Sequence, residues 1–127
     1  MTKKWLLWLP AFLWLLIVTG ASVTPGVSLP KFNLFSVDKL GHLAAYGVLS
    51  WLLLWGYARS AGRRAGWKEG LVVFAFSSAY GIFIEYVQGA FIPGRFYEVD
   101  DMIANAAGAA IAWGLTRIRR LPLPKQV

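Results

Sequence analysis

The sequence contains no cysteine, one histidine, and only six acidic residues against thirteen basic ones. The absence of cysteine excludes disulfides, thiolate nucleophiles and Cys-based zinc or iron–sulfur sites, so a metal would depend on His42 and a few carboxylates. HExxH, GxSxG and P-loop motifs are also missing from the sequence. No enzyme class is therefore indicated by a local motif.

Apolar residues are abundant: 57% of the 127 residues are hydrophobic, and seven are tryptophan. Because roughly 20 apolar residues cross a bilayer core about 30 Å thick, four segments are predicted as transmembrane helices, at 5–23, 40–58, 70–92 and 102–116. The first follows Lys3 and Lys4 as a signal peptide would, but its length and its tryptophans favour a retained span. We predict an all-α bundle of four helices forming a single transmembrane domain over residues 1–127.

The basic residues indicate the orientation of this bundle. Ten of the thirteen lie on the N-terminal tail, the second loop or the C-terminal tail: Lys3, Lys4, Arg59, Arg63, Arg64, Lys68, Arg117, Arg119, Arg120 and Lys125. By the positive-inside rule, both termini and the 58–69 loop are predicted to be cytoplasmic. The net charge of +7 thus results mainly from the basic residues on the predicted cytoplasmic side. A nucleic-acid partner is not expected, because no basic patch lies on a soluble fold.

Two features concern how the helices are arranged. Alanines and glycines crowd residues 102–116, which predicts close backbone packing and a central place for that helix. In addition, 29–40 aligns with 92–102 through an apolar-Pro start and a Val-Asp helix entry, which is compatible with a parallel repeat of two hairpins. A shared need for aspartate at a helix N-terminus explains much of the same likeness.

Polar residues recur at helical spacing on three of the predicted spans, so each of these helices presents one polar stripe. Glu85 is the deepest acid, about 10 Å below Ile92 by the helix rise. Ionisable groups at this depth are costly and usually face inward, where they mark a site. The stripes comprise Asp38, His42 and Tyr46; Ser78, Gly81, Glu85 and Gln88; and Asp101, Asn105 and Gly108.

These residues, in this order, resemble the VanZ-like family of small multi-pass membrane proteins, named for a protein linked to teicoplanin resistance. The likeness covers residues 38–108 and rests on Asp38-Lys39-x-x-His42-x-x-x-Tyr46, Glu85-x-x-Gln88, Pro93-Gly94-Arg95, Asp100-Asp101 and Asn105-x-x-Gly108. It implies a role in the bacterial cell envelope and tolerance of glycopeptide antibiotics. It does not specify a reaction.

Three functions remain open for this cluster. In the first, an outward-facing pocket binds an anionic envelope ligand, such as a lipid or cell-wall precursor headgroup or a peptide carboxylate. Arg95 forms a bidentate fork and Lys39 adds a point charge. The remaining binding residues are Asp38, Gln88, Asp100, Asn105 and Tyr46.

In the second, Glu85 or Asp101 works with His42 as general acid and base on a lipid-linked headgroup. A metal-assisted variant would place a divalent ion on His42, Asp38, Glu85, Asp100 and Asp101; no other cofactor is expected. In the third, the same residues form a structural network of ion pairs without chemistry. Expected partners are membrane lipids, and homo-oligomerisation stays open.

Overall fold

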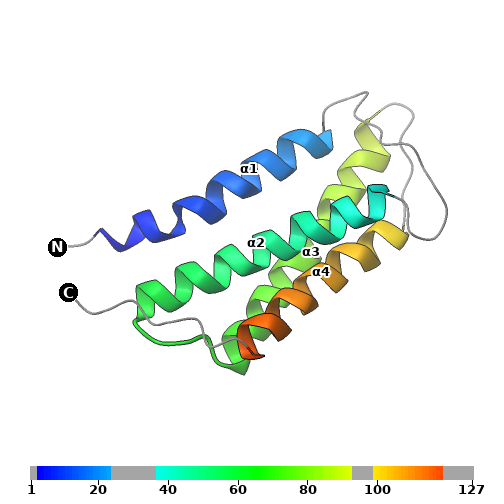
Figure 1. Cartoon of the computed structure of the whole chain (residues 1–127). Helices are drawn as coiled ribbons and strands as arrows, with labels where there is room; N and C mark the ends of the chain where they lie inside the picture. Colours follow the sequence, from blue (N-terminus) through cyan, green and yellow to red (C-terminus); the bar gives the residue numbers. More distant parts are fainter. Residues whose placement is uncertain (1–2, 24–36, 93–98, 119–127) are drawn as a thin grey trace.

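The computed structural model describes residues 3–23, 37–92 and 99–118; the side chains of residues 37, 38 and 118 are not described. A short 3-10 helix, η1 (Lys4–Trp8), continues into α1 (Leu9–Val23). It is followed by α2 (Val37–Ala61), α3 (Trp67–Phe91) and α4 (Val99–Ile118), and no strand occurs in the described ranges. The prediction of an all-α fold with four main helices is confirmed (Figure 1).

Each helix coincides with a predicted span, and α2, α3 and α4 extend beyond it by a few residues at one or both ends. Of the described helices, Lys4–Val23 and Trp67–Phe91 are long and apolar enough to cross a membrane. The other two, α2 and α4, have polar side chains along one face, which lowers their mean hydropathy. The crossing of a membrane by all four therefore remains a prediction.

The N-terminal segment changes helix type just before Pro10. Residues 4–8 are 3-10 helix, and Pro10 lies in the first turn of α1, where a missing backbone N–H leaves no helical hydrogen bond broken. Gly56 of α2 allows this segment to approach, because an added Cβ would lie 3.2 Å from both the Leu7 carbonyl and the Trp8 ring. Pro10 thus begins a helix rather than interrupting one.

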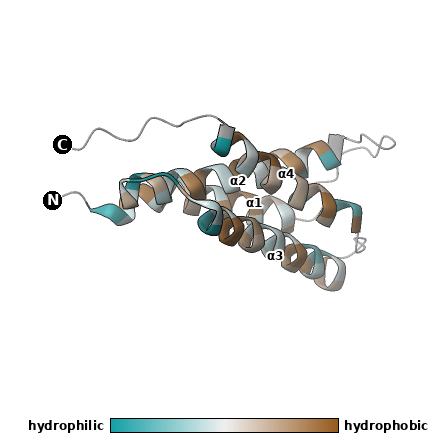
Figure 2. Cartoon of the chain, turned by 90° about the horizontal axis from the view of Figure 1, so that it is seen from below, coloured by the Kyte–Doolittle hydropathy of each residue, from teal (hydrophilic) through white to brown (hydrophobic). Residues whose placement is uncertain are grey.

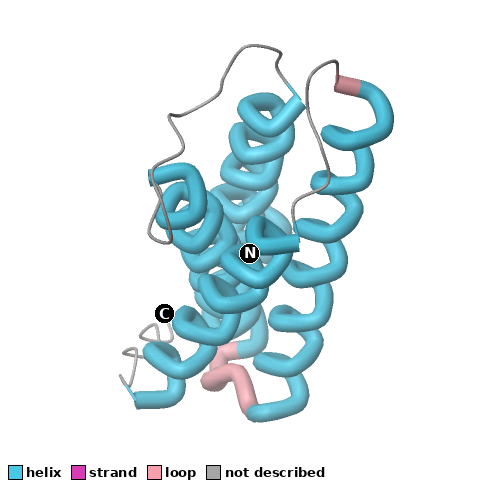
Figure 3. The backbone as a smooth tube through the Cα atoms, turned by 90° about the vertical axis from the view of Figure 1, so that its right-hand side faces the viewer, coloured by secondary structure: helices cyan, strands magenta, loops and turns pink. Residues whose placement is uncertain are grey.

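The helices run alternately up and down, so α1 begins and α4 ends at the same end of the bundle as the loop after α2 (Figures 1 and 3). α2 packs against each of the other described helices, whereas α1 and α4 do not touch. The prediction that residues 102–116 form the central helix is therefore wrong. The contact of α4 with α2 is the most extensive in the bundle, and α4 makes a smaller one with α3.

Glycine makes that contact possible. A Cβ on Gly108 would lie 2.1 Å from the Leu43 carbonyl oxygen, and one on Gly47 would lie 3.3 Å from the Gly108 carbonyl oxygen. At the other end of α4, a Cβ on Gly70 of α3 would lie 2.0 Å from Nε1 of Trp113. The close backbone packing predicted from the small residues is confirmed for α2 and α4.

Polar residues lie among the apolar ones in the interior, while the exterior is largely apolar. Buried polar residues include Ser50, Ser77, Glu85, Gln88, Asp101 and Asn105. Large apolar side chains cover the outside instead, among them Phe12, Leu16, Ile17, Val72, Ile82, Phe83, Ile103 and Ile111. Figure 2 shows hydrophilic residues mainly near helix ends. An apolar exterior of this extent suits contact with lipid.

α1 is attached to this core by polar contacts as well as by packing. The Trp14 indole donates to the Ala45 carbonyl at 2.8 Å, and the Thr19 hydroxyl bonds the Tyr80 hydroxyl. Near the end of α1, the Gln88 amide donates to the Ser22 carbonyl at 2.8 Å. These bonds fix the rotation of α1, whose outer face is almost entirely apolar and exposed.

Candidate functional site

The N-terminal ends of α2 and α4 lie side by side and carry the outer layer of a polar cluster. Lys39 Nζ lies 3.2 Å from Asp100 Oδ2. The side chain of Asp100 is 72% exposed and that of Lys39 is 31% exposed. An ion pair this exposed is weak, because water solvates both partners well when they separate. The pair therefore forms a solvent-exposed rim of the polar cluster, and its two side chains separate at little cost.

His42 lies one turn further into the bundle and contacts two residues of α4. Its Nε2 is 3.6 Å from Asp101 Oδ2, and its Nδ1 is 3.1 Å from Asn105 Oδ1. The i, i+4 spacing of Asp101 and Asn105 places both on the α4 face that meets α2. The side chains of His42 and Asp101 are 16% and 7% exposed, so this layer is largely withdrawn from solvent.

Glycine of α3 provides the space for Asn105. A Cβ on Gly81 would lie 2.7 Å from Asn105 Nδ2, so the amide occupies the volume that any other residue at position 81 would fill. Asn105 is only 1% exposed. It therefore sits where α2, α3 and α4 meet and links the polar stripes of all three helices.

Glu85 and Gln88 continue the cluster on α3, and both are buried, with 2% and 3% exposure. Gln88 donates to the Ser22 carbonyl, so the described contact of this predicted ligand-binding residue is with α1. Tyr46 of α2 is 1% exposed and lies near Glu85 and Tyr80. The interior around Glu85 is thus polar on the α2 side as well.

Sequence reasoning missed the deepest polar contact. The Ser50 hydroxyl donates to the Ser77 hydroxyl at 2.8 Å, and both side chains are fully buried. Ser50 continues the i, i+4 series of His42 and Tyr46, so extending that stripe by one step would have found it. The polar stripe predicted for α3 contains Ser78 instead of Ser77. The polar interior consequently reaches deeper than the predicted outer cluster.

Two predicted residues cannot be placed in this arrangement. Arg95 lies outside the described residues, as does the side chain of Asp38. In the described part of the chain, no three His, Asp or Glu side chains come together in a way that would hold a metal ion. The predicted metal set of His42, Asp38, Glu85, Asp100 and Asp101 thus gains no support from the residues that are described.

The chemistry available follows from the partners of His42. Both ring nitrogens face oxygen atoms of α4: Nε2 faces the Asp101 carboxylate and Nδ1 faces the Asn105 amide oxygen. A histidine held beside a carboxylate has the geometry of a proton-exchanging pair. At the rim, Asp100 pairs with Lys39 instead.

These features define a class: a helical membrane-associated protein whose interior carries a layered polar cluster near one end. A family model described as VanZ/LLP1 matches residues 4–120. The chain therefore belongs to the VanZ/LLP1 family, and the resemblance seen in residues 38–108 is confirmed over nearly the whole chain. Neither a curated protein nor a solved structure matches the sequence.

Proposed function

We propose that the protein spans the bacterial inner membrane four times, with both termini in the cytoplasm, and binds an anionic envelope headgroup on the outer side. The end of the bundle with Lys4, Arg59, Arg63 and Lys68 is strongly basic, which supports this orientation. The polar cluster of α2, α3 and α4 then faces the opposite side of the membrane.

The orientation predicts a simple labelling pattern. The chain has no cysteine, so single replacements at Asn33 and Arg64 are the only thiols present. Arg64 is the labelling position in the loop that follows α2. Gly62 in the same loop is avoided, because it has a φ of 69° that a cysteine would adopt only with strain. A membrane-impermeant maleimide applied to intact cells should label Asn33→Cys and not Arg64→Cys. Labelling of Arg64→Cys alone would reverse the orientation.

The Lys39–Asp100 pair is the observation on which the binding proposal rests. A phosphate or carboxylate approaching the rim replaces Asp100 on Lys39, and the displaced carboxylate loses little because it is already 72% exposed. The buried His42 layer holds α2 and α4 in place beneath the ligand. Arg95, which precedes α4 by four residues, is proposed to add a bidentate fork.

Two matched probes distinguish the sources of such a headgroup. The purified full chain is titrated with a short polyprenyl pyrophosphate, and with a peptide bearing a free C-terminal carboxylate against its amide. Lys39→Gln should weaken binding of the anionic probe by about fivefold, the worth of one basic contact near a membrane surface. Arg95→Lys should weaken it as well, because the charge remains but the fork is lost.

Arg59→Gln is the control for this titration, since Arg59 lies at the other end of α2 and its guanidinium stacks on Trp55. Its binding should equal that of the wild type. Equal affinity of Lys39→Gln and the wild type would contradict the proposal and favour a purely structural network.

The contact between His42 and Asp101 favours an acid–base enzyme as the second candidate. His42 would have to release one of its two oxygen partners to exchange a proton with a substrate. Incubation with the polyprenyl pyrophosphate separates the candidates, because an enzyme converts the probe whereas a binding protein returns it unchanged. Loss of conversion in His42→Ala, at normal folded yield, would support catalysis.

The proposed link to glycopeptide tolerance is tested in cells. Expression of the wild-type chain should raise the teicoplanin concentration needed to stop growth, and Arg95→Lys at equal membrane abundance should abolish that gain. An unchanged gain with Arg95→Lys would separate antibiotic tolerance from the headgroup site.

A further inference from the structure

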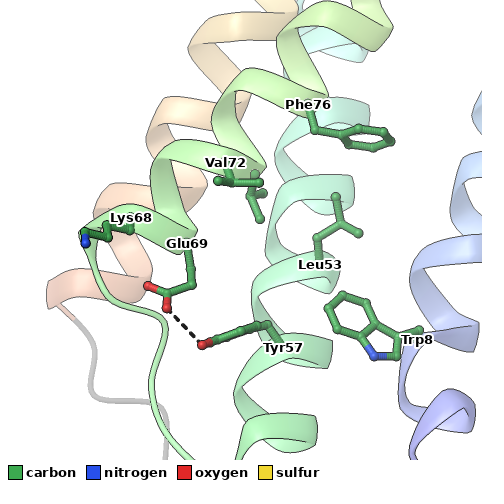
Figure 4. Close-up of a pocket in the computed structure, with 8 residues that line it drawn as sticks. Trp8, Leu53, Tyr57, Lys68, Glu69, Val72 and Phe76 are labelled. Carbon is green, nitrogen blue, oxygen red and sulfur yellow. Dashed lines mark hydrogen bonds between the residues drawn. The ribbon is translucent and has the colours of Figure 1, made fainter.

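A recess lies at the opposite end of the bundle from the polar cluster. It is formed by η1, α2 and α3 and measures about 430 Å³, within the roughly 300–1,000 Å³ typical of small-molecule sites. Trp8 lies across from Val72 and Phe76, with Leu53 of α2 between them (Figure 4). We call this recess the basal groove.

The basal groove is apolar along its length and polar only at its mouth. There Glu69 accepts hydrogen bonds from the Tyr57 hydroxyl at 2.9 Å and from Arg63 at 2.8 Å. The Gly66 backbone N–H donates to its other oxygen at 3.0 Å. The hydrogen bond that Arg63 donates to Glu69 also raises the pKa of the Arg63 guanidinium above its ordinary value, so Arg63 stays charged.

These donors already balance the negative charge of Glu69. The positive charge of the neighbouring Lys68 is not balanced in this way. Lys68 lines the groove mouth and lies 5.8 Å from the ring centre of Trp67, and within the described part of the chain it enters no ion pair. Arg59 and Arg64 add further positive charge at this end. An apolar groove with a cationic mouth complements an amphiphile with an acyl chain and an anionic head.

We propose that the basal groove binds one acyl chain of an anionic phospholipid, with the lipid phosphate at Lys68. The proposed topology places this lipid in the cytoplasmic leaflet, but the chemistry of recognition does not depend on that assignment. The volume of the groove suits a single acyl chain lying between Trp8 and Phe76, so the second acyl chain of the lipid stays in the bilayer. The site is separate from the headgroup site around Lys39 and His42.

Native mass spectrometry of the purified full chain tests this. After exposure to equal amounts of phosphatidylglycerol and phosphatidylcholine with identical chains, the wild type should retain one phosphatidylglycerol molecule preferentially. Lys68→Ala should reduce that preference roughly fivefold while leaving some lipid bound through its chain. Val72→Trp, which fills the groove from an exposed position, should abolish retention of either lipid.

Leu71→Trp is the matched control, because Leu71 is also exposed on α3 but does not line the groove. It should retain lipid as the wild type does, and a thermal melt of each variant confirms that it is folded. Equal retention of the two lipids by the wild type would overturn the role of the cationic mouth. Unchanged retention in folded Val72→Trp would overturn the groove itself. If an apolar peptide added to the same mixture were retained in preference to both lipids, the groove would have a different occupant.

Discussion

Gly108→Ala should destabilise the protein by about 3 kcal/mol, the upper end of the usual cost of overpacking a close contact. The new methyl group would lie 2.1 Å from the Leu43 carbonyl oxygen and 3.0 Å from the Gly47 nitrogen. Both are backbone atoms, so no side-chain rotation relieves the clash. The two helices must separate, and the His42 contacts with α4 would lengthen.

Gly114→Ala is the matched control, since it lies on the same helix and an added Cβ there meets nothing within 4 Å. It should be neutral or stabilise the helix by up to about 1 kcal/mol, the usual difference between glycine and alanine. Unfolding in mild detergent with increasing sodium dodecyl sulfate, followed by far-UV circular dichroism, measures both variants. Equal stability of the two would mean that α2 and α4 do not meet at Gly108.

Asp101→Ala should be the most costly change within the polar cluster, at about 3 kcal/mol. Removing one member of a buried polar pair leaves its partner unsatisfied in a medium of low polarity, and the cost is highest where a charge is involved. Asp101 is 5% exposed, and its carboxylate faces His42 at 3.6 Å. Asp100→Ala is the comparison, and because that side chain is 72% exposed it should cost less than about 1 kcal/mol.

The same unfolding measurement, extended to a double-mutant cycle, isolates the His42–Asp101 contact. His42→Ala combined with Asp101→Ala should cost less than the sum of the two single changes, because the double variant leaves neither residue without its partner. Strict additivity would show that His42 and Asp101 do not interact, and that the cluster is held together by other contacts.

The helices were predictable because each is a long apolar segment bounded by prolines, glycines or charges. The polar stripes were predictable for the same geometric reason: His42 and Asn105, predicted on facing helices, do meet. The small residues of α4 correctly predicted close packing. They did not predict its partner, because periodicity defines a face of a helix but not the neighbour that covers it.

Other features depend on tertiary contacts that leave a weak trace in the sequence. Whether Ser77 or Ser78 faces α2 depends on the rotation of α3, which neighbouring serines do not define. The contact between Gln88 and the Ser22 carbonyl joins a side chain to a backbone atom 66 residues away. The basal groove is formed where Trp8 of η1 comes near α2 and α3, and residue type alone does not indicate that these three elements meet.

The most direct test of the proposed function is the affinity of Asp100→Asn for whichever anionic probe the wild type binds, measured beside Lys39→Gln in the same detergent. Asparagine removes a carboxylate that competes with the probe for Lys39, so binding should tighten by about fivefold, whereas Lys39→Gln weakens it by a similar factor. If the cluster were only a structural network, neither substitution would change the affinity for the probe. Opposite shifts are the predicted result; a weakening in both variants, or no binding of any anionic probe by the wild type, would contradict the account.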